Sequence, residues 1–315
     1  MANQEKFKTS IGGQALIEGI LMRGPEKDAI VIRGAEGMKL EVSDRKVYPE
    51  GSWKRWPFIR GVFNFFDSQV VGVKALMRSA DLAPEEMQEE PSQFDQWLEK
   101  RLGSEAFQKA LVSIAVFMGL GLSILLFFLL PMTVASFFDG RITSVLGINL
   151  LEGLIRMVIF LTYMFLVSRM KEMKRLFSYH GAEHKTIRCY EAELPLTVEN
   201  VRPQTRLHPR CGTSFLFVVI IISILVSAVF SAIFPIGNTV LRMLSRLVML
   251  PFIVAIAYEF NRLVARHDNA LTRALTAPGM WFQLFTTNEP DDSMIEVAIE
   301  AMKLVIPEQQ GKDNW

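Results

Sequence analysis

The sequence has few cysteines and almost no excess of positive charge, the two features that mark disulfide-rich and nucleic-acid-binding proteins. It holds two cysteines in 315 residues, and 34 lysines and arginines are almost balanced by 33 aspartates and glutamates. Two cysteines cannot form a disulfide framework and fit a reducing compartment or thiol chemistry. Nucleic-acid binding is disfavoured, because a formal net charge of +1 leaves no excess to bind a phosphate backbone. Residues 1–10 lack an apolar stretch, so we expect no cleavable signal peptide.

Apolar residues, by contrast, are abundant. Half of the chain is hydrophobic, only 21% is charged, and the mean hydropathy is +0.25. This composition excludes a disordered or collagen-like chain and indicates a membrane protein. Residues 110–138 and 211–241 contain no charged side chain, and each stretch exceeds the roughly 20 residues that cross a bilayer as a helix. Both are predicted to be transmembrane helices.

Two further stretches, residues 142–168 and 239–258, are apolar but interrupted by charge. Each carries two charged residues four positions apart, which places them on one helical face toward one end of the helix. We therefore expect snorkelling or one buried ion pair, in preference to a transport pathway, which needs charges near the middle of the membrane. The charged residues are Glu152, Arg156, Arg242 and Arg246.

The distribution of basic residues favours four spans over two. Residues 169–213 carry nine lysines and arginines, whereas the link at residues 139–147 carries only Arg141. The positive-inside rule places the basic loop in the cytoplasm. The basic N-terminal and C-terminal regions can share that side only if all four stretches cross the bilayer.

The remaining segments complete a mainly α fold, a polytopic four-helix transmembrane protein with a small N-terminal β-containing cytoplasmic region. Residues 29–32 and the alternating residues 38–47 predict a small hairpin. Residues 58–77 predict an amphipathic helix on the inner leaflet or against the bundle, and residues 81–105 an acidic linker with a short helix. The expected regions are 1–57 (β-containing), 58–108 (amphipathic helix and linker), 109–168 (helices 1 and 2), 169–213 (cytoplasmic His/Cys-rich loop), 214–260 (helices 3 and 4) and 261–315 (C-terminal, cytoplasmic).

Five of the six histidines and cysteines fall between residues 180 and 211. His180 and His184 are one helical turn apart, so on a helix their rings share a face, and His208 and Cys211 form a second pair. Zinc prefers nitrogen and sulfur ligands, and two ligands from a helix plus one or two from a later loop suit tetrahedral coordination. The alternative is that these histidines only cap and hydrogen-bond the end of the bundle.

Residues 180–184 read H-G-A-E-H, which matches the inverted zincin pattern H-x-x-E-H. In that pattern Glu183 is the general base toward a metal-bound water. The chain departs from inverted zincins because those are soluble domains with a distant acidic ligand that is not identifiable here. Gly181 is also a poor residue for a helix interior. We expect Cys189 to be a small buried hydrophobe and His267 to be a surface or capping residue.

Two other polar segments have simpler interpretations. The glycine-rich residues 12–24 lack both a Walker lysine and the G-x-G-x-x-G spacing, so a phosphate loop is unsupported. Glu18 and Arg23 in this segment are candidates for a polar contact to the His-rich loop. Asp291 or Asp292 is expected first to cap the following helix and only second to bind a hard cation.

Four blocks of the chain resemble the hallmark segments of the bacterial YqhQ-like membrane family, a domain of unknown function. They are GGQALIEGILMRG (12–24), FSYHGAEHKTIRCYE (177–191), HPRCGTSF (208–215) and PGMWFQLFTTNEPDDSMIEVAI (278–299). The resemblance covers nearly the whole chain and implies a multi-pass protein of the bacterial inner membrane. Members are commonly described as metal-dependent enzymes on the strength of these motifs. The signature positions that carry over are His180, Glu183, His184, His208 and Cys211.

Two functions fit these observations. The first is an inner-membrane protein with a zinc site at its cytoplasmic face, acting as a hydrolase on an amphiphilic or membrane-borne substrate. The second is a non-enzymatic scaffold, assembly or regulatory protein with a structural metal or none. The coordination number discriminates between them, because catalytic zinc has three protein ligands plus solvent and structural zinc has four. The lipid bilayer is the expected partner. Transport is disfavoured, since the two long spans offer no ionisable group.

We predict that both termini and residues 169–213 face the cytoplasm, because this loop carries nine basic residues. Reporter fusions after each span should therefore report cytoplasmic location at both ends and in this loop. An external loop would contradict the four-span topology and would leave Cys189 and Cys211 exposed to oxidation.

Overall fold

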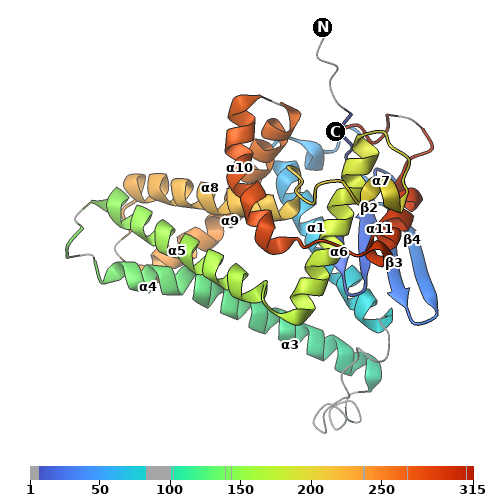
Figure 1. Ribbon diagram of the computed structural model, residues 1–315. Coiled ribbons are helices and arrows are strands. Elements are labelled where there is room, and N and C mark those ends of the chain that lie inside the picture. Colours follow the sequence, from blue (N-terminus) through green and yellow to red (C-terminus); the bar gives the residue numbers. More distant parts are fainter. Residues whose placement is uncertain are drawn as a thin grey trace. The chain divides into compact units, whose positions relative to one another are not determined.

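The structure is a computed structural model (Figure 1). Its chain divides into two compact units. It describes residues 7–82, 101, 103–138, 140–142, 144–236, 238–267, 269–309 and 311–315. Most of the predicted acidic linker, residues 83–100, therefore lies outside the described residues. The first unit comprises Met1–Pro84, Met164–Ile222 and Leu250–Trp315, and the second Glu85–Tyr163 and Ser223–Met249.

The first unit contains a four-stranded antiparallel sheet in the order β1-β2-β3-β4. The strands are β1 (Gly12–Leu16), β2 (Gly19–Arg23), β3 (Lys27–Gly34) and β4 (Gly37–Asp44). The expected hairpin corresponds to β3 and β4, whose partners include Val31 and Leu40. The prediction missed β1 and β2, because β2 is apolar on successive residues and so lacks the alternation of a half-exposed strand.

Helices cover both faces of this sheet, which explains why β2 does not alternate. Ile20 and Met22 point into a core shared with α6 and α11, whereas the intervening Leu21 packs with Ala75 of α1. Neighbouring strand residues thus fill opposite cores, as the two-residue period of a strand requires. The covering helices are α1 (Ile59–Leu82), α6 (Lys171–Glu191) and α11 (Asp292–Val305).

Further helical segments lie wholly within this unit. They are the 3₁₀ turn η1 (Trp53–Arg55), α7 (Val198–Val201) and α10 (Ala270–Thr286). The predicted amphipathic helix at residues 58–77 is α1, which begins one residue later and continues to Leu82.

In the described part of the chain, four helical segments are long and apolar enough to cross a membrane, as the sequence predicts. They are Ser113–Ser136, Leu146–Val167, Gly212–Ile233 and Val240–Val264. The first combines α3 (Ser104–Ile124), the π-helical turn η3 (Leu125–Leu129) and α4 (Leu130–Ser136). The others belong to α5 (Val145–Val167), α8 (Gly212–Ile233) and α9 (Thr239–Arg266).

The π-helical turn in the first span coincides with a proline. Pro131 has no N–H to donate to the carbonyl of Phe127 four residues earlier, so the regular helical ladder is interrupted there. Arg156 of α5 donates from Nε to this carbonyl at 2.7 Å. A charged group inside the second unit thus satisfies a backbone acceptor that the proline leaves without its helical donor.

Three of the four charged residues of the two interrupted spans form a buried ion cluster, which agrees with the buried ion pair that was one of the two expected arrangements. Glu152 accepts a hydrogen bond from Arg156 at 2.8 Å and also contacts Arg246 of α9. Arg246 donates in addition to Asn149 at 3.1 Å. Glu152, Arg156 and Arg246 are all buried, so these charges are compensated by one another and not by water.

Glu152→Gln tests this cluster. The change removes the only negative charge of the trio and leaves two buried guanidinium groups without a carboxylate, which should lower stability by about 3–5 kcal/mol. Thermal denaturation of the detergent-purified protein measures the loss. Glu300→Gln, which breaks an exposed pair with Lys303, should cost at most about 1 kcal/mol. Equal stability of the two variants would contradict the structural role of the cluster.

Gly181 lies in the middle of α6 where another segment of the first unit runs along the helix. Asn288 donates its backbone N–H to the carbonyl of Phe177 at 2.8 Å, and its side chain donates to Lys174 at 3.0 Å. A Cβ atom on Gly181 would collide with the Asn288 carbonyl oxygen. The glycine is therefore required by close packing, despite its low helix propensity.

Gly181→Ala should consequently destabilise the protein by about 1–3 kcal/mol, the usual cost of overpacking. Gly119→Ala in α3 is a matched control, because a Cβ there meets nothing within 4 Å. The control should be neutral or stabilising by up to about 1 kcal/mol, as expected for glycine replaced by alanine in a helix. Thermal denaturation in detergent measures the change in stability of each variant. A stabilising effect of Gly181→Ala would refute the packing argument.

Candidate metal centre

His180, His184 and Cys211 come together in the first unit. The two histidines lie one turn apart on α6, and Cys211 precedes the first residue of α8. One ligand atom from each of the three residues lies within 4.8 Å of the others. Two ligands of a tetrahedral zinc ion are separated by roughly 3.3–3.6 Å, so small side-chain rotations bring these atoms to coordination distance.

Backbone carbonyls fix the orientation of both histidine rings. His180 Nδ1 lies 2.8 Å from the Thr286 carbonyl, and His184 Nδ1 lies 2.5 Å from the Arg206 carbonyl. Because a carbonyl can only accept, each Nδ1 carries the proton and donates it. In the neutral ring this leaves the Nε2 lone pair for a metal, which is how protein surroundings commonly orient histidine ligands.

The surroundings of Cys211 favour its thiolate form. Its Sγ lies 3.2 Å from His180 Nε2 and accepts from the Thr213 backbone N–H at 3.4 Å, at the beginning of α8. Burial alone would raise the pKa of the Cys211 thiol, but the adjacent His184 and His180 hold it well below its usual range. Burial likewise opposes protonation of His180, yet Cys211 and Glu183 raise its pKa to about 9. These contacts therefore favour a charged pair of Cys211 and His180.

Glu183 lies between the two histidines on α6 and is buried. In the part of the chain that the structure describes, no group hydrogen-bonds its Oε2 atom. Burial raises the pKa of Glu183, an effect that the neighbouring His180, His184 and the Gly13 N–H oppose. A Cβ on Gly13 would lie 3.0 Å from the Glu183 Cδ atom, so the glycine of β1 allows the carboxylate to approach the sheet.

His208 lies beside the three clustered residues but turns away from them. Its ring centroid is 5.6 Å from that of His184, and its Nε2 lies 3.4 Å from Glu191, which also contacts Arg210. Burial, and then the nearby His184, hold the pKa of His208 well below its usual range, so its contact with Glu191 is a hydrogen bond of the neutral ring. The structure thus groups Cys211, and not His208, with the α6 histidines.

Gln283 of α10 positions the segment that contains His208. Its side chain accepts from the His208 N–H at 2.8 Å, donates to the His208 carbonyl at 2.6 Å and donates to Ser214 at 2.7 Å. Gln283 is fully buried, so these bonds satisfy its amide. No spacing rule points to Gln283 or to the Thr286 and Arg206 carbonyls. The resemblance to family blocks was the available signal, since Gln283 and Thr286 lie in the block at residues 278–299.

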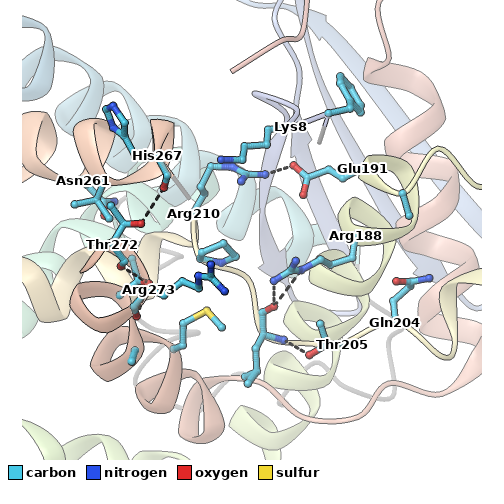
Figure 2. A pocket seen from close by; sticks show the side chains of 18 of the residues that line it. Lys8, Arg188, Glu191, Gln204, Thr205, Arg210, Asn261, His267, Thr272 and Arg273 are labelled. Atoms are coloured by element: carbon cyan, nitrogen blue, oxygen red, sulfur yellow. Dashed lines mark hydrogen bonds and ion pairs between the residues drawn. The ribbon is translucent and has the colours of Figure 1, made fainter. Parts of the chain in front are cut away.

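A cavity of about 1090 Å³ adjoins His208 on the side of Glu191 (Figure 2). Figure 2 shows Arg188, Arg210 and Arg273 reaching into it, with Arg210 bonded to Glu191 and Arg188 to the Leu207 carbonyl. The three clustered residues are not among the described residues that line this cavity. The cavity is therefore a neighbouring space that does not include the three clustered residues.

Other predicted residues have structural partners. Cys189 is fully buried in the hydrophobic core, and the exposed His267 contacts the Leu263 carbonyl at the end of α9, as expected. Glu18 reaches α6, where it accepts from Arg175 and from Tyr179. Further contacts are Arg23 with Asp28 and Asp67, Asp291 as the N-cap of α11, Asp292 with Arg202, and Glu289 with Lys185.

Of the two candidates for a polar contact to the His-rich loop, Glu18 therefore makes one, whereas Arg23 is bound by Asp28 of β3 and Asp67 of α1. The capping role of Asp291 is confirmed, since its side chain accepts from the Met294 N–H at 3.0 Å.

Comparison with known proteins places the chain in a family. A family model described as "Protein of unknown function (DUF1385)" matches residues 56–308. "Uncharacterized protein YqhQ" of Bacillus subtilis (strain 168) is 33% identical over 307 residues, which cover 95% of this chain and 93% of that protein. No solved structure matches the chain. The chain belongs to the DUF1385 family of proteins of unknown function.

Proposed function

We propose that this protein is a multi-pass membrane protein that binds zinc through His180, His184 and Cys211 and hydrolyses an amphiphilic or membrane-borne substrate. The observation that carries the proposal is the donation of both Nδ1 protons to backbone carbonyls, beside a cysteine sulfur that lies 3.2 Å from His180 Nε2 and within 4.8 Å of a His184 ring nitrogen. Histidines that bind a metal commonly donate their other ring N–H to a backbone carbonyl, as both histidines do here. Histidines that only cap a helix have no need of a cysteine sulfur beside them. Zinc suits this nitrogen and sulfur donor set.

Three ligands favour a catalytic site over a closed one. Zinc held by three protein side chains keeps a position for water, whose pKa it lowers, and it polarises the bond to be broken. Glu183 would accept the proton of that water at Oε2, the atom without a hydrogen-bond partner in the described residues. The burial that raises the pKa of Glu183 helps the carboxyl group to keep this proton until the leaving group takes it.

The position of Cys211 supports a membrane-borne substrate. Cys211 immediately precedes the candidate span Gly212–Ile233, so the centre lies where a predicted membrane helix begins. A substrate with a polar reactive group and an apolar part would present its reactive group at the membrane surface, where this span begins. The basic loop of residues 169–213 would place this centre at the cytoplasmic face.

A structural metal is the second candidate, favoured by burial. His184 and Cys211 are only 1% and 8% exposed, so an ion there would tie α6 to the start of α8 within the first unit. Such an ion would stabilise a scaffold or regulatory protein without any substrate.

Zinc content and genetic complementation distinguish these functions. The detergent-purified wild type and Glu183→Gln should each hold about one zinc ion per chain, whereas His184→Ala should lose it, because two remaining ligands bind weakly. His267→Ala, which removes an exposed histidine, is the matched control and should keep the metal. Bound zinc should also protect Cys211 from alkylation by iodoacetamide, and a chelator should remove that protection.

The same variants then separate catalysis from structure. If the protein is a hydrolase, neither Glu183→Gln nor His184→Ala should restore the phenotype of a deletion strain. Full complementation by Glu183→Gln together with failure of His184→Ala would reject catalysis and retain a structural metal. A wild-type protein that holds no metal, and whose Cys211 is alkylated regardless of added zinc, would reject both the catalytic zinc site and the structural metal site.

A further inference from the structure

A second cavity, of about 380 Å³, opens at the beginning of α1 and is lined mainly by cations. It is built entirely from the first unit and does not include the histidines or Cys211. Its basic side chains are Arg45, Lys46, Lys54, Arg55, Arg60 and Arg262.

The acidic groups near this cavity do not balance these charges. Asp67 is the acidic residue among the described residues that line it, and its carboxylate is bound by Arg23 at 3.0 Å. Arg60 pairs with Glu259 at 2.5 Å. No carboxylate of the described residues forms an ion pair with Lys46 or Arg55. The cavity therefore carries surplus positive charge, which attracts an anion.

Two of the cations are also held in place. Arg45 donates to the Gly24 carbonyl at 2.7 Å, and burial, followed by repulsion from Arg23, lowers its pKa. The Lys54 ammonium lies over two aromatic rings, 4.8 Å from the centroid of Tyr48 and 5.0 Å from that of Phe63. These contacts orient the cations without neutralising them, so the cavity is organised before any ligand arrives.

Exposed aromatic side chains flank this cavity. Trp53, Trp56 and Phe58 are 53%, 60% and 54% exposed, and the two tryptophans flank the consecutive cavity residues Lys54 and Arg55 in the sequence. Tryptophan and basic residues are enriched together where proteins meet the head-group layer of a membrane.

The conformation of Phe58 holds its exposed ring at this place. Its φ of +66° is unusual for a bulky residue, and its backbone N–H donates to Glu259 at 3.0 Å. A conformation that costs free energy persists only where surrounding contacts enforce it.

The helix that follows continues this apolar surface. Phe66, Val70, Val73 and Met77 of α1 are 58%, 53%, 44% and 38% exposed and recur at helical spacing on one face. The opposite face of α1 packs on the sheet through Ala75. An exposed apolar stripe on a helix whose other face is already buried is the pattern of a helix that lies on a membrane surface.

Direct contacts join α1 to a candidate membrane span. Asn64 donates to the Tyr258 hydroxyl of α9 at 2.8 Å, and a Cβ on Gly61 would lie 2.7 Å from the Tyr258 side chain. Tyr258 and Glu259 belong to the candidate span Val240–Val264, as does the cavity residue Arg262. The cavity and the apolar stripe are thus attached to a helix that is itself suited to a bilayer.

We propose that this cavity binds the phosphate-bearing head group of an anionic lipid while Trp53, Trp56, Phe58 and the α1 stripe contact the same leaflet. Arginine and lysine bind phosphate oxygens through charge-assisted hydrogen bonds. Clustered basic residues next to a membrane helix attract anionic lipids. A free phosphate would explain the cations but not the adjoining exposed aromatic and aliphatic side chains. The site is independent of the proposed zinc centre.

The test compares three probes on the full-length protein in a zwitterionic detergent: dioctanoyl phosphatidic acid, dioctanoyl phosphatidylcholine and inorganic phosphate. Microscale thermophoresis should show binding of the phosphatidic acid that is about tenfold or more weaker in Lys46→Gln/Arg55→Gln, since each removed charge contributes several-fold. Lys39→Gln, an exposed lysine of β4 that does not line the cavity, is the matched control and should bind as the wild type does.

Phosphatidylcholine should bind at least about tenfold more weakly than phosphatidic acid, because it carries no net charge to meet the surplus cations. Equal binding of the two lipids, or unchanged binding in the double variant, would overturn the proposal. Inorganic phosphate that binds as tightly as the lipid would assign the cavity to a soluble anion instead. In vesicles, lipid brominated near its head group should quench tryptophan emission, and Trp53→Phe/Trp56→Phe should lose most of that quenching. Unchanged quenching in this variant would contradict the placement in the leaflet.

Discussion

The first unit depends on the burial of a polar helix. The central residues of α6 include a glutamate, a lysine and two histidines, yet Glu183, His184 and Lys185 are each at most 6% exposed. A buried polar group without a partner costs about 1–3 kcal/mol, and a buried charge costs more. Every element around α6 therefore has to supply a partner as well as apolar contact. The carbonyls of Arg206 and Thr286 and the Glu289 carboxylate serve this purpose for the side chains of α6 from segments distant in sequence.

This requirement explains why the glycines lie where they do. Gly181 lets the Asn288 backbone reach α6, and Gly13 lets the Glu183 carboxylate reach β1. Either position with a side chain would separate the helix from groups that satisfy it. Hydrophobic packing alone would tolerate small shifts of α6 along the sheet, whereas hydrogen bonds at both histidines hold its register. The geometry of the candidate metal centre is thus fixed by backbone groups that no sequence motif records.

The sequence was informative where one segment determines its own structure. Long charge-free stretches predict spans from length alone, and His180 and His184 share a face because they are one turn apart. Prediction was poorer where structure depends on distant partners. Leu21 of β2 is buried by α1 and Ile20 by α6 and α11, so a strand covered on both faces showed no alternation. The pattern H-x-x-E-H likewise could not decide between His208 and Cys211, because Gln283 and Glu191 orient the intervening segment.

The two buried glutamates differ in whether the described residues pair their charge. This difference distinguishes the ion cluster of the second unit from the candidate metal centre of the first. In the second unit, Glu152 is bound by Arg156 and Arg246, so the cluster needs no additional ligand. In the first unit, Glu183 has an oxygen atom for which the described residues provide no donor, and it lies beside a thiolate and two oriented imidazoles. Burying such a group is unfavourable unless a proton, a metal-bound water or a substrate compensates it. Burial of Glu183 therefore marks it as the group of this centre that a proton, a metal-bound water or a substrate would compensate.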